Sequence, residues 1–145
     1  MSELAPRDQG ECLGLGCEVD EIPRLNEWFD GRGLLLGIDE DTLADLKVCI
    51  NEVVANVIAH GGRSDAAIEV RLWLDGTQVF TEVVDNGEAF DPTGVDDRTA
   101  GKDLESETIG GWGIPLMRQL SDHMSYRHAG GRNHTRFVKK TETSV

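Results

Sequence analysis

One stretch of the chain, from Asp39 to Gly62, limits most strongly how the chain can fold. Asp39 is a suitable N-cap for a helix, and Gly61 and Gly62 are suitable residues to end one. Between these ends, apolar residues recur at helical spacing: Leu43, Leu46, Ile50, Val53, Val54, Val57 and Ile58. The spacing predicts a long helix that buries one face against the rest of the molecule.

A polar stripe crosses this apolar helix. Glu52, Asn56 and His60 recur every four residues and therefore share one helix face. A solvent-facing stripe is normal on an amphipathic helix, but apolar neighbours favour a cavity instead: Cys49, Val53, Ala55 and Ala59. Buried polar groups are costly without a partner. Asn56 is therefore a candidate ligand for a hard cation such as Mg²⁺, and Glu52 a candidate proton acceptor.

The rest of the chain predicts a second layer built from hairpins. Strands are expected at 11–19, 67–74, 79–84, 123–128 and 135–139, with turns at Asp75-Gly76 and Gly130-Gly131. Further helices are expected from about Asp20 to Gly31 and over 114–120. Residues 91–109 are polar and acidic without periodicity, which predicts a functional lid or disorder. Helices interspersed with hairpins favour an α/β (α+β) two-layer sandwich over a doubly wound parallel sheet.

Length and composition fit one globular domain. We expect a loose N-terminus over 1–10, a single domain over 11–140 and a tail over 141–145. No apolar run has the length of a membrane span and the N-terminus lacks a signal sequence, so the expected location is the cytoplasm. Three cysteines, an odd number, argue against a disulfide framework and are expected to be buried thiols.

The charge of the chain is strongly negative and uneven. A net charge of −13 disfavours direct binding of nucleic acid, which needs a basic surface. The segment from Glu82 to Glu107 has nine acidic residues, whereas the segment from His123 to Lys140 has five basic residues and no acidic one. Each segment can be an ordinary solvated face, and the acidic one can also steer a basic partner.

Two further motifs follow the long helix. Asp85-Asn86-Gly87 ends an apolar strand and has ordinary turn chemistry, but Asp85 could also accept a hydrogen bond from an adenine amino group. Gly87 would then let the base approach the backbone. Gly110, Gly111 and Gly113 precede a helix, where free N–H groups can bind phosphate.

These motifs occur in the order and spacing of a known superfamily. The segments NEVVANVIAHGG, VVDNGEAFDP and GGWGIPLMRQLSD together resemble the GHKL (Bergerat-fold) ATPases, with GGRNHTRFVKK similar to the last strand. Within that superfamily the chain is most similar to the small anti-sigma-factor serine/threonine kinases of the RsbW/SpoIIAB type. The resemblance implies a histidine-kinase-like fold with a mixed, mainly antiparallel sheet and about three helices on one face.

The resemblance also implies roles for single residues. Glu52 corresponds to the general base, Asn56 to the Mg²⁺ ligand, and Asp85 to the carboxylate that reads adenine, with Gly87 beneath the base. ATP phosphates would contact Gly110, Gly111 and Gly113, and Asn133 falls where relatives often have a Thr lining the adenine pocket. Because ATP and this chain are both anionic, Lys102 or Arg98 from the predicted lid would assist binding. The chain departs from the family pattern at Ala89, Trp112 and Pro115.

Three functions remain open at this stage. The resemblance implies a protein kinase that phosphorylates an anti-sigma-factor antagonist (a STAS domain), binds a sigma factor as a competing partner, and forms a homodimer. A non-catalytic switch module that sequesters partners is the first alternative. A plain ATP hydrolase is the second, because one carboxylate can activate either a hydroxyl group or water.

Overall fold

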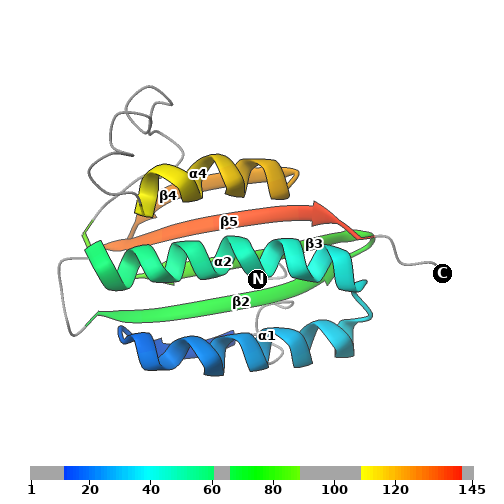
Figure 1. Ribbon diagram of the computed structural model, residues 1–145, viewed down its shortest axis with the longest axis horizontal. Helices are drawn as coiled ribbons and strands as arrows, with labels where there is room; N and C mark the ends of the chain where they lie inside the picture. The colour runs from blue at the N-terminus through cyan, green and yellow to red at the C-terminus, as the bar shows by residue number, and fades with distance from the viewer. Residues whose placement is uncertain (1–11, 61–65, 89–108, 142–145) are drawn as a thin grey trace.

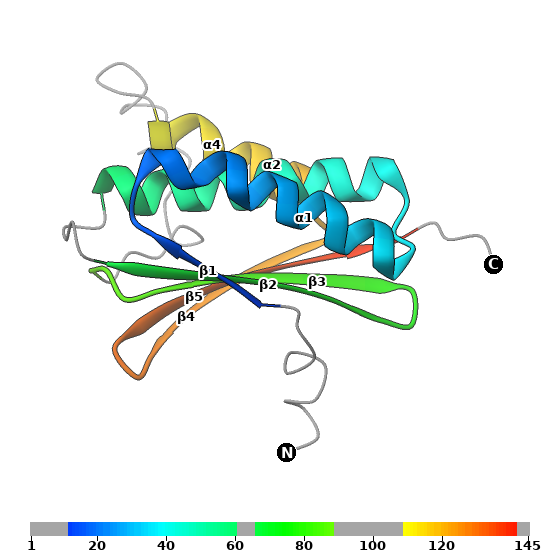
Figure 2. The same cartoon turned by 90° about the horizontal axis from the view of Figure 1, so that it is seen from below.

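The computed structural model describes residues 12–60, 66–88 and 109–141, with backbone alone at residues 60 and 109–114. These residues form two layers, a five-stranded sheet and α-helices that lie on one of its faces (Figure 1). Figure 2 shows the helices together on that side of the sheet. In chain order the elements are β1 (Cys12–Gly16), the short 3-10 helix η2 (Val19–Glu21), α1 (Ile22–Leu36), α2 (Glu40–His60), β2 (Ala67–Asp75), β3 (Gln78–Asp85), α4 (Ile109–Leu120), β4 (His123–Ala129) and β5 (Arg132–Lys140).

The sheet has the strand order β1-β2-β3-β5-β4, and every neighbouring pair is antiparallel. The predicted two-layer class is confirmed, and the sheet was expected to be mixed but is antiparallel throughout the described strands. Tight turns join β2 to β3 and β4 to β5. Gly76 has φ 66°, and Gly130 and Gly131 have φ 63° and 75°, a left-handed region that favours glycine.

Helix α2 forms the centre of the core, as the apolar spacing predicts. Leu46, Ile50 and Val54 are fully buried and belong to the same cluster as Val70 and Phe137 on the sheet. The predicted cap is also present, because the Asp39 carboxylate accepts a hydrogen bond from the Thr42 N–H at 3.0 Å. Of the other predicted core positions, Leu43 and Val53 are buried, and Val57 and Ile58 are partly buried against the cluster.

Helix α1 continues to Leu36, beyond the end predicted at Gly31. Gly33 is buried against Leu43 of α2, so a glycine within α1 permits close helix packing. Gly37, with φ 77°, ends the helix and donates its N–H to the carbonyl oxygens of Gly33 and Leu34.

Helix α4 begins at Ile109 and not at the predicted residue 114. The helix therefore includes Gly110, Gly111 and Gly113 in its first turns. Glycine weakens a helix by about 1 kcal/mol per residue but does not forbid one, and packing overrides this preference. That packing is anchored by Met117, which is fully buried and accepts a hydrogen bond from the Cys49 thiol of α2 at 3.8 Å.

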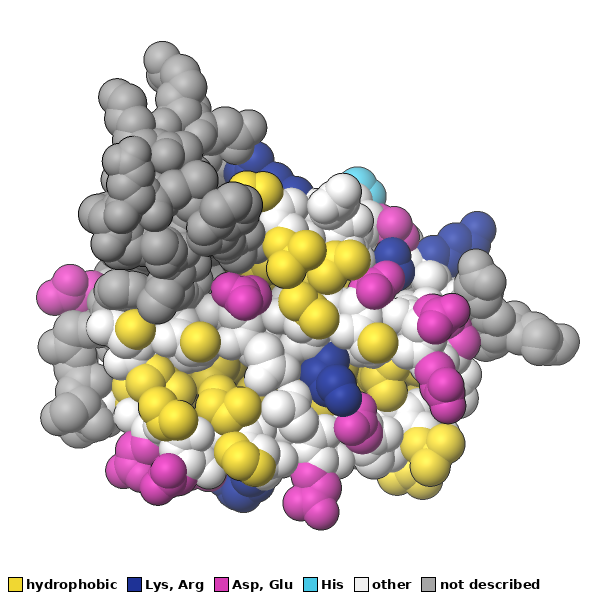
Figure 3. All heavy atoms as spheres, in the orientation of Figure 1, with side chains coloured by type: hydrophobic (Ala, Val, Ile, Leu, Met, Phe, Trp, Pro, Cys, Tyr) yellow, Lys and Arg dark blue, Asp and Glu magenta, His cyan; other side chains and the backbone are white. Residues whose placement is uncertain are grey.

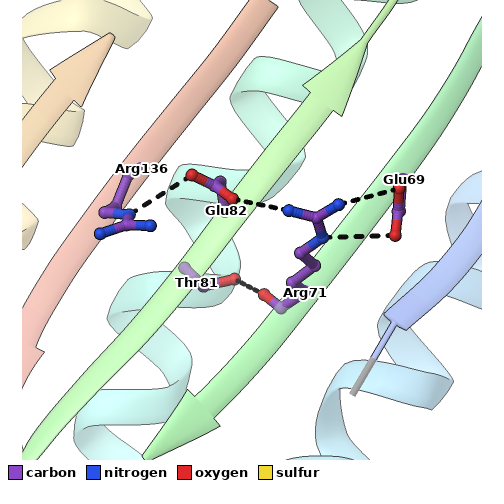
Figure 4. Close-up of polar contacts among 5 residues, drawn as sticks. All are labelled: Glu69, Arg71, Thr81, Glu82 and Arg136. Carbon is purple, nitrogen blue, oxygen red and sulfur yellow. Dashed lines mark hydrogen bonds and ion pairs between the residues drawn. The ribbon is translucent and has the colours of Figure 1, made fainter. Parts of the chain in front are cut away.

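The opposite face of the sheet holds a charged network that the sequence analysis did not predict (Figure 4). Glu82 of β3 is only 2% exposed and pairs with Arg71 of β2 at 3.1 Å and Arg136 of β5 at 3.3 Å. The Arg136 guanidinium also lies over the stacked rings of Trp73 and Phe80. A buried carboxylate needs such partners, and together they connect three neighbouring strands.

Charge is distributed unevenly between the helices and the β4–β5 hairpin. Residues 18–60, which form η2, α1 and α2, include ten acidic and three basic residues. Figure 3 shows acidic side chains distributed over the helix face. The β4–β5 hairpin is instead basic, as the sequence pattern indicates. Among the helices that the structure describes, none is long and apolar enough to cross a membrane.

The cysteines differ from expectation. Cys49 is buried, and its burial raises the pKa of the thiol to about 12. Cys17 is only partly buried, and Cys12 is exposed because it lies on the edge strand β1. The expectation of three buried thiols was therefore wrong for Cys12.

Candidate functional site

The predicted site segments meet at one end of the molecule (Figure 1). The C-terminal end of α2, the end of β3, the start of β5 and the start of α4 all lie there, and Figure 2 shows the same arrangement. The antiparallel register explains part of this convergence, since Asp85 at the end of β3 pairs directly with Asn133 near the start of β5.

Asn56 presents an unusual atom at this end of α2. The residue is only 9% exposed, and its side-chain oxygen Oδ1 is buried without a hydrogen-bond partner among the described residues. A buried amide oxygen without a donor costs about 1–3 kcal/mol, so such atoms call for an explanation such as a bound ion. The helix that carries Asn56 is also held firmly, because Asn51 and Asn26 of α1 exchange side-chain hydrogen bonds of 2.7 and 3.3 Å.

Glu52 lies one helical turn before Asn56 and is partly buried. This burial raises the pKa of its carboxyl group above the ordinary value, because loss of water disfavours the charged form. A carboxylate with a raised pKa is a better proton acceptor, so the local environment suits general-base chemistry.

Asp85 is only 4% exposed at the end of β3. Its Oδ1 atom accepts a hydrogen bond from the Gly87 N–H at 2.8 Å, which is the turn chemistry that the Asp-Asn-Gly sequence predicts. The next residue, Asn86, accepts the Ala67 N–H at 2.8 Å and so ties the turn to the start of β2. The turn is therefore fixed on both sides, with Gly87 itself buried.

Asn133 is also 4% exposed and connects Asp85 to this turn. Its side-chain N–H groups donate to Asp85 Oδ1 at 3.0 Å and to the Glu88 carbonyl oxygen at 2.9 Å. The Asn133 side-chain oxygen accepts a hydrogen bond from the Tyr126 hydroxyl of β4. Asn133 was predicted from the sequence as a residue of the candidate site, whereas Tyr126 was not.

Cys17 links the helix side of this region to the Asp85 side. Its thiol donates to the Val57 carbonyl oxygen of α2 at 3.8 Å. Burial raises the pKa of the Cys17 thiol, and the negative charge of Asp85 raises it further. Because Cys17 lies close to both, Asp85 and the α2 residues next to Asn56 border the same region.

The donor set fits a magnesium ion. The Asn56 Oδ1 atom is a hard oxygen ligand with no competing donor in the described part of the chain, and Mg²⁺ prefers such oxygens. No cluster of three His, Cys, Asp or Glu residues occurs among the described residues. The ion would therefore be held by one protein oxygen together with substrate phosphates and water, an arrangement that is common for Mg²⁺.

For several predicted site residues, the described part of the structure contains no contact with the other residues of the candidate site. Lys102 and Arg98 of the predicted lid, together with Ala89, lie outside the described residues. Gly110, Gly111 and Gly113 lie within α4, so only the N–H groups of its first turn are free of helical bonding. The His60 side chain and the phosphate contacts of these glycines stay predictions.

Comparison with known proteins identifies relatives of the chain. Residues 25–139 match the family model described as the histidine kinase-like ATPase domain. The serine/threonine-protein kinase BtrW of Bordetella bronchiseptica is 32% identical over 91 residues, which cover 61% of this chain and 64% of BtrW. The serine-protein kinase RsbW of Listeria monocytogenes is 28% identical over 101 residues, covering 66% of this chain and 64% of RsbW. The chain thus spans less than two thirds of the length of these relatives.

A solved structure has a similar fold. The crystal structure of the RsbU and RsbW domains of Rv1364c from Mycobacterium tuberculosis superimposes with a TM-score of 0.61 at 18% sequence identity. The match covers 90% of this chain and 32% of that one. At this identity the likeness concerns the fold, and the two-layer arrangement is what the two proteins share.

Proposed function

The chain belongs to the histidine kinase-like ATPase domain family, and we propose that it is an ATP-dependent protein serine/threonine kinase of a partner-switching system. Its substrate would be a STAS-domain anti-sigma-factor antagonist, and it would act as an anti-sigma factor by binding a sigma factor. The working form would be a homodimer. Relatives named as serine kinases support the reaction class.

One observation carries the proposal more than any other. Asn56 Oδ1 is a buried oxygen without a partner among the described residues, and Glu52, one helical turn away, is a partly buried carboxyl group with a raised pKa. Phosphoryl transfer needs a held cation and a group that accepts the proton of the attacking hydroxyl. These two side chains offer both functions on one helix face.

The residues divide the work of the proposed reaction. Asn56 would hold Mg²⁺, which supplies positive charge to the ATP phosphates. Asp85 would accept a hydrogen bond from the adenine amino group, with Gly87 under the base. The N-terminus of α4 would donate N–H groups to phosphate. Glu52 would take the proton from a serine or threonine hydroxyl of the partner, whose oxygen then bonds to the γ-phosphorus as the bond to the ADP oxygen breaks.

The test combines labelled ATP with a purified STAS partner. We expect wild-type protein to transfer the γ-phosphoryl group to a partner serine or threonine. Asn56→Ala should weaken Mg²⁺-dependent ATP binding by about tenfold, since a ligand to charged phosphates and metal is lost. Glu52→Gln should keep ATP binding within about twofold and reduce transfer by about 10²–10⁴-fold, the usual contribution of a general base.

Controls separate this proposal from its alternatives. Glu40→Gln changes an exposed side chain of the same helix without removing the proposed cation ligand, so Mg²⁺-dependent ATP binding should persist. ATP binding without label on the partner would contradict the kinase proposal and support a switch module. Phosphate release that needs no partner would instead support a hydrolase, and equal ATP affinity in wild type and Asn56→Ala would refute the metal assignment.

A further inference from the structure

Asn133 occupies a central position between the strand and turn that form the candidate adenine site. Its two side-chain N–H groups face three acceptors: Asp85 Oδ1 at 3.0 Å, the Glu88 carbonyl oxygen at 2.9 Å and the Gly87 carbonyl oxygen at 3.4 Å. Asp85 and Asn133 are direct partners in the β3–β5 register. One side chain therefore joins the buried carboxylate to the turn that follows it.

These contacts leave the two carboxylate oxygens of Asp85 unequal. Oδ1 accepts from both the Gly87 N–H and the Asn133 amide. No described residue donates a hydrogen bond to Oδ2. Among the described residues, Oδ2 is also not one of the buried side-chain atoms that lack a hydrogen-bond partner. A carboxylate held by two donors at one oxygen has a fixed rotamer, so its other oxygen keeps one direction.

Tyr126 completes the arrangement from β4. The Asn133 side-chain oxygen accepts the Tyr126 hydroxyl hydrogen bond, while the amide nitrogen faces only acceptors. Reversing the amide would place its oxygen against a carboxylate and carbonyl oxygens and its N–H groups against the hydroxyl. The donors and acceptors therefore permit one amide orientation, and Tyr126 supports it.

We infer that Asn133 and Tyr126 are positioning residues that aim Asp85 Oδ2 at the 6-amino group of a purine and so set the preference for adenine. Neither residue needs to touch the nucleotide, because both act through Asp85. This inference rests on the proposed nucleotide-binding function and adds the source of its base selectivity.

The inference separates base recognition from general binding. A purine nucleotide without the 6-amino group cannot donate to Asp85, so loss of the aiming contacts should not weaken its binding. A merely structural role of Asn133 would weaken both nucleotides together. The ratio of the two affinities therefore distinguishes positioning from stability.

The experiment measures by calorimetry, with Mg²⁺ present, the affinities for ATP and for purine riboside 5′-triphosphate, which lacks the 6-amino group. Wild-type protein should bind ATP at least about tenfold more tightly, since a hydrogen bond to a charged acceptor is lost in the analogue. Asn133→Ala should weaken ATP binding by about tenfold and change analogue binding by less than about twofold. Tyr126→Phe, a conservative change, should reduce the ratio by about threefold because the amide contacts remain.

Ser125→Ala is the matched control, because Ser125 is the exposed neighbour of Tyr126 on β4 and pairs with Arg136 instead. It should keep the wild-type ratio. An unchanged ratio in both Asn133→Ala and Tyr126→Phe, or an equal loss for both nucleotides, would overturn the inference and leave the kinase proposal in place. Equal wild-type affinities for the two nucleotides would do the same. Absence of any Mg²⁺-dependent nucleotide binding by wild-type protein would overturn the proposed function itself.

Discussion

At the scale of single residues, Asn56 and Glu52 on α2 each carry an energetic cost, and the two costs differ in kind. Asn56 buries an oxygen without a donor among the described residues, so a ligand would relieve the cost. Glu52 is partly buried and its pKa is raised, so its charged form is destabilised near neutral pH. Such costs are expected at a functional site, where stability is exchanged for activity.

The raised pKa of Glu52 gives a prediction about stability. Between the unfolded carboxyl pKa of about 4.3 and the higher folded value, the native state binds more protons than the unfolded state, so stability falls as pH rises. Glu52→Gln should therefore increase the melting temperature at pH 7. The increase should vanish below about pH 4, where the carboxyl group is protonated in both states.

Melting curves of wild type and Glu52→Gln across this pH range provide the measurement. The exposed Glu27 of α1 offers a matched control, since Glu27→Gln should show no comparable pH-dependent gain. If Glu52→Gln is less stable than wild type at pH 7, the carboxylate has a stabilising partner and the assignment of a raised pKa is wrong.

Some site residues could be predicted from sequence because their signal is local. Glu52 and Asn56 share a face by helical spacing alone, and the Asp85–Gly87 turn follows from the chemistry of three successive residues. Tyr126 could not be assigned in this way, because its contact with Asn133 joins two different strands, β4 and β5. The signal was available in the Gly130-Gly131 turn, since a two-residue turn fixes the register that places both side chains on one face.

At the scale of elements, the close approach of α1 and α2 depends on Gly33. A Cβ atom at this position would lie 2.5 Å from both terminal methyl carbons of Leu43, which is itself buried. Gly31, two residues earlier in the same helix, is exposed and has open space around the equivalent position. The two glycines therefore form a matched pair for mutagenesis.

We expect Gly31→Ala to stabilise the protein by about 0.5–1 kcal/mol, because alanine favours a helix. Gly33→Ala gains the same preference but forces Leu43 out of its position, so a net loss of about 1–2 kcal/mol is expected. Urea unfolding measures both values. Adding Leu43→Ala to Gly33→Ala should cost less than the two single changes together, and strict additivity would exclude the proposed contact.

The predicted start or end of a helix was correct where local side-chain chemistry determines it. The start of α2 follows from the Asp39 cap. The end of α1 and the start of α4 were misplaced because glycine was taken as a helix boundary in both, whereas the end of α4 at Leu120 was predicted correctly. In each case a helix continues through glycine where it packs on α2, and that packing depends on residues far away in the sequence.

At the scale of the whole molecule, Asp39 ties the helix layer to the end of the sheet. One carboxylate oxygen caps α2 through the Thr42 N–H, and the other accepts the Thr141 hydroxyl at 2.7 Å across 102 residues of sequence. Thr141, which the sequence analysis assigned to the tail, is buried here. The Asp39 side chain thus makes both the helix cap and the contact with Thr141, a residue far away in the sequence.

Asp39→Ala should lower the free energy of unfolding by about 1–3 kcal/mol, since it removes a helix cap and a buried hydrogen bond. Asp41→Ala changes an exposed acid in the first turn of the same helix and should cost only a few tenths of a kcal/mol. Thr141→Val should account for about 1 kcal/mol of the Asp39 effect. Equal losses for Asp39→Ala and Asp41→Ala would show that neither contact contributes to stability.

The class of fold was predictable because the hydrophobic pattern indicates the order of helices and hairpins. The Glu69, Arg71, Glu82 and Arg136 network was not, since charged residues on a strand normally indicate a solvated face. Only the strand order brings Arg71 and Arg136 to either side of Glu82 (Figure 4). The residue pattern of a single strand does not indicate which strands will be its neighbours in the sheet.

The strand order also leaves two edges, and they differ in how they resist aggregation. β4 carries Arg127, and a positive charge on an edge strand repels a second copy. β1, with the sequence CLGLG, has no charge, and its protection comes from its length of five residues and from two side chains. Arg24 donates to the Gly14 carbonyl oxygen, and Glu21 accepts the Gly16 N–H, each at 3.0 Å. In concentrated solution, intermolecular β-sheet growth should therefore start at β1, so the colloidal stability of a preparation depends on this short strand.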